Sequence, residues 1–329
     1  GCGLLNNFLF IFFEMSNVNE SLINITTEQR FQGTEERVLF STLTALPCCM
    51  FLFINATMLR SLRSKAVFRQ TCRYILLFNL LFADTIQMVL SQLLHILAAC
   101  RISLTYPMCG SLTSLANLMT VISPLTLVIM SLERFVAVCY PLRHGSITSM
   151  RNTTAAISAI WTLSSLHVLT QNLLLIEYPF YQLQSLQMVD FCSMFAMLLG
   201  SGSDYYDKAF TTLLFVTAGM AVISTYIGVI IAARSASADK ALAQKARNTV
   251  LLHVMQLGLS VSATIFIPII IAIGRVVTRL NFVRILNLLY FFFLLLPRCL
   301  SSLIYGIRDQ TIRPVLLNHL CCHCNAKPN

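Results

Sequence analysis

The sequence carries very little charge. Only 11% of its 329 residues are charged, whereas 57% are hydrophobic. A soluble globular domain contains about 25% charged residues, so this chain has too little polar surface to cover a water-soluble particle. The composition therefore excludes an ordinary soluble domain and predicts an integral membrane protein.

Three further patterns are missing. No segment shows the alternation of apolar and polar residues that is typical of a membrane β-strand, and no long period indicates a repeat array. No serine has a paired base, and His95, His167 and His253 stand isolated in the sequence. These absences exclude a β-barrel and a repeat array. They also predict that the protein is not an enzyme and holds no cofactor or metal.

Long apolar runs dominate what remains. A helix that crosses a bilayer needs roughly 20 mostly apolar residues, and seven stretches meet this requirement: 38–59, 74–98, 109–139, 154–176, 209–233, 249–274 and 282–305. Short polar segments separate them, apart from a longer one at 177–208. We expect an all-α membrane protein: a seven-transmembrane-helix bundle over 38–305, after an extracellular segment (1–37). A cytoplasmic tail (306–329) would begin with a short amphipathic helix.

Basic residues indicate which side of the membrane each loop occupies, because they collect on the cytoplasmic side. With residues 1–37 outside, the inner segments contain 15 basic and three acidic residues, and the outer segments contain seven and nine. This predicts an extracellular N-terminus and a cytoplasmic C-terminus. The basic excess is thus explained by topology and contact with membrane lipid, not by nucleic-acid binding. On the outside, "NES" and "NIT" make Asn19 and Asn24 candidate glycosylation sites.

The first 14 residues, "GCGLLNNFLFIFFE", contain no Met and lack the basic flank of a signal peptide. We expect Met15 to be the initiator and residues 1–14 to be absent from the native protein.

The cysteines divide by side of the membrane. Cys100, Cys109 and Cys192 lie toward the outer, oxidising side, where disulfides persist, and Cys100 competes as a partner for either of the other two. On the inner side, "CCHC" (321–324) lacks the second ligand pair of a structural zinc site. We interpret it as a palmitoylation site that anchors the tail helix, with the modified residues Cys321, Cys322 and Cys324.

The stretch "SLERFVAVCYPLRH" (131–144) ends the third span. Glu133 and Arg134 follow an uncharged run from Asn117 to Leu132, and a cation at the membrane boundary is costly unless it pairs or snorkels. This stretch resembles the acid–Arg–aromatic triplet of the rhodopsin-like G-protein-coupled receptors, and its wording is similar to "MAxDRYVAICxPLxY" of olfactory receptors, especially those of fish. Further matches in the other spans are Asn55, Asp84, Trp161, Pro268 and Tyr305.

The resemblance implies a plasma-membrane receptor that binds a small odorant-type molecule from outside and activates a heterotrimeric G protein. It favours a Cys109–Cys192 disulfide, and it implies that Glu133 holds Arg134 until activation frees it. Residues that would contact the G protein or brace the opened inner cleft are Tyr140, Pro141, Tyr226 and Tyr305. Two alternatives stay open: a rhodopsin-like receptor for another ligand, and a small transporter or channel. The oligomeric state stays unknown.

Asp84 lies in the middle of the second span and needs a partner. Aligned on Tyr305, Arg298 falls on the helix turn that would face it. We hypothesise that Arg298 takes the place of the sodium ion that the family often holds there; the alternative is that Arg298 snorkels to the inner side. The chain departs from the family in reading "SSLIY" (301–305) for Asn-Pro-x-x-Tyr and in having Ala218 for a fifth-span proline.

A ligand pocket is implied where the third span carries Thr113, Ala116, Asn117 and Thr120 at helical spacing, on one stripe. Ala116 occupies the position of the aspartate of amine receptors, which argues against an amine ligand. A mostly apolar cavity with a few amides and hydroxyls would suit a neutral or weakly polar molecule. Each candidate could instead serve bundle packing. The remaining candidates are Gln87, Phe210, Thr211, Phe266, Ile270, Asn287 and Phe291.

Three arginines, Arg275, Arg279 and Arg284, cluster before the seventh span, on the outer side. They could attract an anionic ligand, or they could cap helix ends and contact lipid phosphate.

Overall fold

The computed structural model describes residues 34–64, 66–176 and 201–235, together with 187–188, 192–193, 197, 244, 251, 255, 258, 273, 284–285 and 288–296. Most of the predicted sixth and seventh spans lies outside the described residues, as do both chain ends. Predicted sites that therefore lie outside them are Asn19, Asn24, Phe266, Ile270, Asn287, Arg298, Tyr305, Cys321, Cys322 and Cys324.

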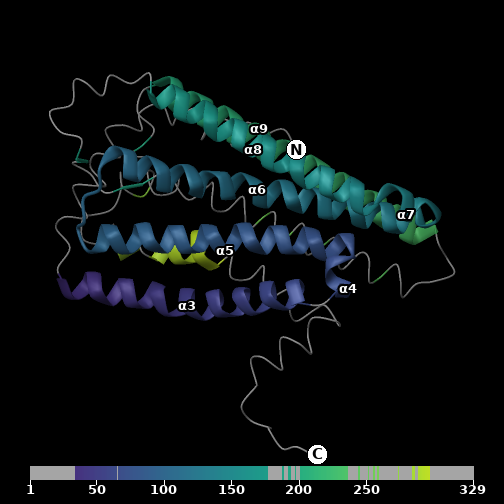
Figure 1. The fold of residues 1–329 in the computed structure, drawn as a ribbon, viewed down its shortest axis with the longest axis horizontal. Helices are drawn as coiled ribbons and strands as arrows, with labels where there is room; N and C mark the ends of the chain where they lie inside the picture. The colour runs from purple at the N-terminus through teal and green to yellow at the C-terminus, as the bar shows by residue number, and fades with distance from the viewer. Residues whose placement is uncertain are drawn as a thin grey trace, which may run out of the picture.

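Five long helices make up most of the described structure and lie side by side (Figure 1). They are α3 (Thr34–Ser64), α5 (Cys72–Ala99), α6 (Tyr106–Cys139), α8 (Met150–Ile176) and α9 (Ser201–Ser235). Each is long and apolar enough to cross a membrane. The first five predicted spans are thus confirmed as helices, while the sixth and seventh stay predictions.

The start of α9 differs from the sequence-based expectation. The span was predicted from residue 209, but the helix begins at Ser201, so the outer segment predicted at 177–208 ends earlier. The first turns, "SGSDYYDK", are too polar for a hydropathy pattern to detect. They are helical nonetheless, and the contact of Lys208 Nζ with Asp204 Oδ2 at 2.5 Å one turn away adds a small stabilisation.

Short elements connect the long helices at one end. α4 (Ala66–Arg69) follows α3, while η2 (Pro141–Arg143) and α7 (His144–Ile147) follow α6. Within the predicted seventh span, η4 (Tyr290–Leu295) is a π-helical turn. Its Phe291 and Leu295 pack with Cys48 of α3 and Met88 of α5.

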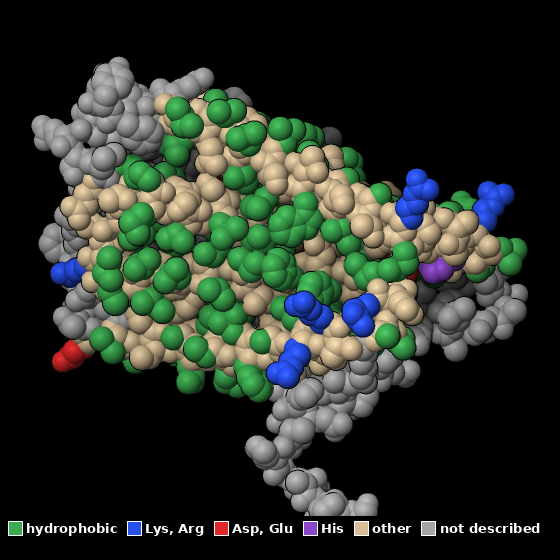
Figure 2. Space-filling view, in the orientation of Figure 1, with side chains coloured by type: hydrophobic (Ala, Val, Ile, Leu, Met, Phe, Trp, Pro, Cys, Tyr) green, Lys and Arg blue, Asp and Glu red, His purple; other side chains and the backbone are tan. Residues whose placement is uncertain are grey.

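Exposed apolar stripes mark the faces that would meet lipid. On α3 the exposed positions recur every three or four residues, which is one side of a helix. Large apolar side chains rarely gather this way on water-soluble surfaces. Figure 2 shows hydrophobic side chains across the middle of one face and Lys and Arg gathered toward the end that holds α4 and α7. The exposed α3 stripe consists of Leu39, Leu43, Leu46, Met50 and Phe53.

Buried polar side chains connect the helices inside the bundle. Asn79 of α5 donates to Thr126 Oγ1 of α6 at 2.9 Å, and it accepts from Trp161 Nε1 of α8 at 2.9 Å. Asn55 of α3 donates to Thr85 of α5 at 3.1 Å. Such bonds act between membrane helices because the surrounding hydrocarbon offers no competing partner.

Candidate functional site

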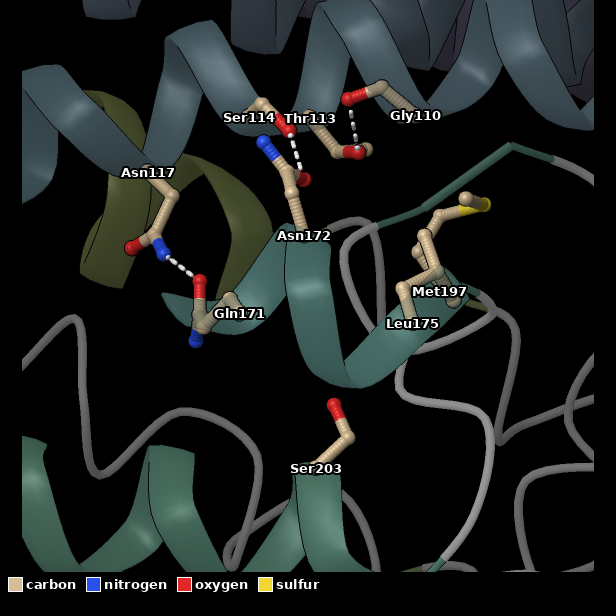
Figure 3. A pocket seen from close by; sticks show the side chains of 9 residues that line it. All are labelled: Gly110, Thr113, Ser114, Asn117, Gln171, Asn172, Leu175, Met197 and Ser203. Carbon is tan, nitrogen blue, oxygen red and sulfur yellow. Dashed lines mark hydrogen bonds between the residues drawn. The ribbon is translucent and has the colours of Figure 1, made fainter. Parts of the chain in front are cut away.

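A partly open pocket lies toward the end of the bundle where α6 begins. The cavity itself measures about 30 Å³, and it lies within about 370 Å³ of space between the walls that is partly open to solvent. Helices α6, α8 and α9 supply its walls, and their side chains reach in from different directions (Figure 3). The described lining residues are Gly110, Thr113, Ser114, Asn117, Gln171, Asn172, Leu175, Met197 and Ser203.

The lining combines polar side chains with apolar surface. Six of the nine described residues carry a hydroxyl or carboxamide, and none of the nine is charged. Apolar atoms nevertheless make up most of the accessible surface of the lining, in line with the expected mostly apolar cavity with a few amides and hydroxyls. Helix α8 contributes two adjacent amides, Gln171 and Asn172, which were not among the predicted residues.

Hydrogen bonds tie the pocket walls together. Ser114 Oγ donates to Asn172 Oδ1 at 2.8 Å. Asn117 Nδ2 donates to Gln171 Oε1, and Gln171 Nε2 donates to Asp207 Oδ1 of α9. These bonds join α6, α8 and α9 in one chain of side chains. Because polar groups in an apolar bundle are costly without partners, this chain fixes how the three helices sit together.

His167 extends this network and is not isolated, contrary to the sequence analysis. It is 2% exposed, and its Nε2 lies 3.3 Å from Asn117 Nδ2. The amide nitrogen is a donor, so Nε2 accepts and the proton lies on Nδ1, which lies 3.3 Å from the Tyr206 hydroxyl. The ring also stacks on Phe210, with centroids 3.6 Å apart. His95 likewise stacks on Tyr290, at 4.5 Å.

The structure brings only some of the predicted ligand residues to this pocket. Thr113 and Asn117 line it, and Phe210 lies behind it against His167. Thr120 donates to the Ala116 carbonyl at 2.9 Å on the same α6 stripe, but neither residue lines the pocket.

The other candidates lie elsewhere. Gln87 is buried on α5, and its Oε1 has no hydrogen-bond partner among the described residues. Thr211 is half-buried on α9, and Phe291 packs with Cys48 and Met88. None of these three lines the pocket described here.

Gln171, Asn172, Ser203 and Asp207 were not predicted from the sequence. A signal was available for the first two, because adjacent amides within an apolar span are expensive and usually functional. Ser203 and Asp207 carried no such signal, because the helix that holds them extends beyond the apolar run.

A disulfide lies at the end of the bundle where α6 begins. Cys109 at the start of α6 is bonded to Cys192, which confirms the favoured pairing, and Cys100 is free and exposed. Leu104 and Met197 pack around the bridge. A side chain at Gly110 would meet Met197 at 3.2 Å, so the bridged segment lies directly against the pocket wall.

The opposite end of α6 holds the predicted switch. Arg134 Nε lies 2.9 Å from Glu133 Oε2, and His144 Nε2 lies 3.5 Å from Glu133 Oε1. Glu133 is buried, so the pair is shielded from water on one side. The structure therefore places Glu133 and Arg134 in contact, and it adds His144, which the sequence analysis did not assign.

The other described switch candidates lie at this end or further along the bundle. Tyr140 directly follows α6 and is 52% exposed, and Pro141 begins η2. Tyr226 is half-buried on α9. Asp84, 3% exposed in the middle of α5, accepts a hydrogen bond from Ser123 Oγ at 2.9 Å. Arg298, its hypothesised partner, lies outside the described residues, so the Asp84–Arg298 pair stays a hypothesis.

Comparison with known proteins shows which family the chain resembles. The model of the "7 transmembrane receptor (rhodopsin family)" matches residues 55–305. Odorant receptor 131-2 of Danio rerio is 33% identical over 274 residues, 83% of each chain. Olfactory receptor 4E2 of Homo sapiens is 24% identical over 256 residues, which cover 75% of this chain and 77% of that one. The chain belongs to the rhodopsin family of seven-transmembrane receptors and, within that family, to the odorant-receptor type.

Proposed function

We propose that this protein is an odorant receptor of the plasma membrane. It binds a small molecule from the extracellular side and activates a heterotrimeric G protein on the cytoplasmic side. One observation carries the proposal: the single helix α6 lines the pocket with Thr113 and Asn117 and holds the Glu133–Arg134 pair near its other end. At 1.5 Å per residue, Asn117 and Arg134 lie about 25 Å apart along the helix axis. That separation approaches the thickness of the hydrocarbon core.

The pocket end faces outside in this proposal. The Cys109–Cys192 bridge at that end requires an oxidising compartment. Arg63 in the last turn of α3 and Arg143 in η2 lie at the opposite end, where Figure 2 shows Lys and Arg side chains gathered, and basic residues collect on the cytoplasmic side. The chain forms seven spans, with the last two in 249–274 and 282–305. Asn19 and Asn24 are then extracellular glycosylation sites. A cytoplasmic helix follows Tyr305, anchored by palmitoylation at Cys321, Cys322 and Cys324.

Activation releases Arg134 from Glu133. At rest the carboxylate holds the guanidinium, and ligand binding shifts the bundle toward a state in which Arg134 meets the G protein. Tyr140 and Pro141 form part of the same inner surface, and Tyr226 and Tyr305 brace the opened cleft. The ligand needs a higher affinity for the active state, because only differential binding shifts such an equilibrium.

The test is a second-messenger assay on cells that express the full chain and are exposed to waterborne odorants. The matched variant is Arg134→Ala, which should reach the cell surface yet give no ligand-driven signal. Signalling preserved in Arg134→Ala would overturn the role of this residue. Expression of the native gene in olfactory sensory neurons separates an odorant receptor from a rhodopsin-like receptor for another ligand.

A further inference from the structure

The hydrogen-bond chain behind the pocket runs in one direction. A carboxylate only accepts hydrogen bonds, so Asp207 accepts from Gln171 Nε2. Gln171 must then turn its Oε1 toward Asn117, whose Nδ2 donates to it. The orientation of both amides therefore follows from the position of one carboxylate on α9.

This direction leaves Asn117 with an acceptor for the pocket. Its Nδ2 serves both Gln171 Oε1 and His167 Nε2, and neither bond uses Oδ1. Asn117 is only 4% exposed and lines the pocket. Because few polar partners compete inside an apolar bundle, an occupant that donates a hydrogen bond to Asn117 Oδ1 is favoured.

Helix α8 supplies a hydrogen-bond donor to complement the Asn117 acceptor. Asn172 uses Oδ1 to accept from Ser114, which leaves its Nδ2 to donate. Ser203, 4% exposed on α9, adds a hydroxyl that can donate or accept. Figure 3 shows these side chains reaching in from three helices. Leu175 and Met197 supply apolar contact for a carbon skeleton.

We propose that the pocket selects a small neutral molecule that carries a hydroxyl or carboxamide group, with its donor on Asn117 Oδ1 and its acceptor at Asn172 Nδ2. The inference rests on the proposed function and narrows its ligand class. It disfavours ethers and hydrocarbons, which cannot donate, and ions, which would meet no opposite charge among the described lining residues. Asp207 is a positioning residue, because it acts through Gln171 and Asn117.

Matched pairs of compounds test the ligand class. Alcohols are compared with their methyl ethers, and primary carboxamides with their N,N-dimethyl forms, in the second-messenger assay and in thermal unfolding of the purified receptor. Carboxylates and amines of the same skeleton complete the panel. The donor-bearing member should act at concentrations about tenfold lower than its capped partner, the ratio expected for about 1.4 kcal/mol. Equal potency within the pairs, or stronger responses to the ions, would overturn the proposal.

Asp207→Asn tests the positioning role. An asparagine side chain can also donate a hydrogen bond, so the donors and acceptors of the Asn117–Gln171–Asp207 hydrogen-bond chain are no longer fixed. Gln171 can then turn its Nε2 toward Asn117 Oδ1. The potency ratio within each pair should then fall toward one. Asp204→Asn is the matched control, because Asp204 lies one turn away, pairs with Lys208 and does not contact Gln171; it should keep the wild-type ratio. A ratio unchanged in Asp207→Asn, or lowered equally by both variants, contradicts the positioning role.

The second-messenger assay and thermal unfolding together allow the ligand class and the proposed function to fail independently. A receptor that is stabilised by the donor-bearing compounds but gives no second-messenger signal would reject the receptor function and retain the ligand class. A receptor that signals to apolar compounds without discriminating within the pairs would retain the function and reject the class. Silence in both assays, with the protein present at the cell surface, would reject both.

Discussion

Phe135 of α6 lies directly over Gly228 of α9. A Cβ placed on Gly228 would stand 2.4 Å from Phe135 Cε2, a distance that real side chains do not adopt. Cys139, one turn further along α6, lies with its Sγ 3.8 Å from the Gly228 carbonyl oxygen. The close approach of the two helices next to the Glu133–Arg134 pair therefore depends on the missing side chain at Gly228.

Gly228→Ala should lower the stability of the receptor by about 1–3 kcal/mol, because the extra methyl forces the ring or the helix to move. The matched control is Gly219→Ala on the same helix, where an added Cβ meets no atom within 4 Å. Thermal unfolding of the purified proteins measures the difference. Phe135→Leu in the Gly228→Ala background should recover part of the loss. Equal stability of the two alanine variants would show that the contact does not constrain the helices.

Glu133→Gln should raise signalling in the absence of ligand. The substitution keeps the size of the side chain but removes the charge that holds Arg134 at 2.9 Å. Because solvent screens the partly exposed arginine, the substitution should remove about 1 kcal/mol of interaction energy from the resting state. That loss corresponds to a roughly fivefold shift of the resting equilibrium toward the active state. Basal second-messenger level per surface receptor is the measurement.

His144→Ala provides the comparison for this pair. It removes only the longer contact to Glu133, at 3.5 Å and from a more exposed side chain, so its basal level should stay near that of the wild type. A basal level in Glu133→Gln no higher than that in His144→Ala would mean that Glu133 does not restrain Arg134.

Much of the described fold follows from the length of the apolar runs. Cys72–Ala99 and Met150–Ile176 extend only a few residues beyond the predicted spans, because spanning helices must satisfy every backbone group internally. The start of α9 was missed because its first turns, "SGSDYYDK", are polar. A hydropathy pattern detects the apolar part of a helix and not a polar extension of it.

The candidate site was only half predictable. Periodicity places Thr113 and Asn117 on one face of α6, but it does not say which helix packs against that face. His167 looked isolated because its contacts lie 39–50 positions away in the sequence and on other helices. They are Asn117 on α6 and Tyr206 and Phe210 on α9. Contacts between helices are set by bundle packing, which a single sequence does not encode in its local pattern.

Replacing both Cys109 and Cys192 by serine should destabilise the receptor by about 2–5 kcal/mol and reduce the amount at the cell surface. The bridge joins positions 83 residues apart and holds the segment that packs against Gly110. Cys100→Ser should have no such effect, because Cys100 is free. Surface labelling and thermal unfolding give the two measurements. A Cys100→Ser variant as damaged as the double variant would place Cys100 in a disulfide.

Asn79 and Trp161 should be coupled in a double-mutant cycle. Asn79→Ala leaves the Trp161 indole N–H without its acceptor and the Thr126 hydroxyl without its donor, at a cost of about 1–3 kcal/mol. Trp161→Phe removes the indole N–H itself, so the alanine at position 79 should cost less in that background. Hydrogen bonds between membrane helices contribute about 0.6 kcal/mol on average and up to about 1.7, and the coupling energy from thermal unfolding should fall in this range. Additive losses would show that the bond between α5 and α8 contributes nothing to the stability of the bundle.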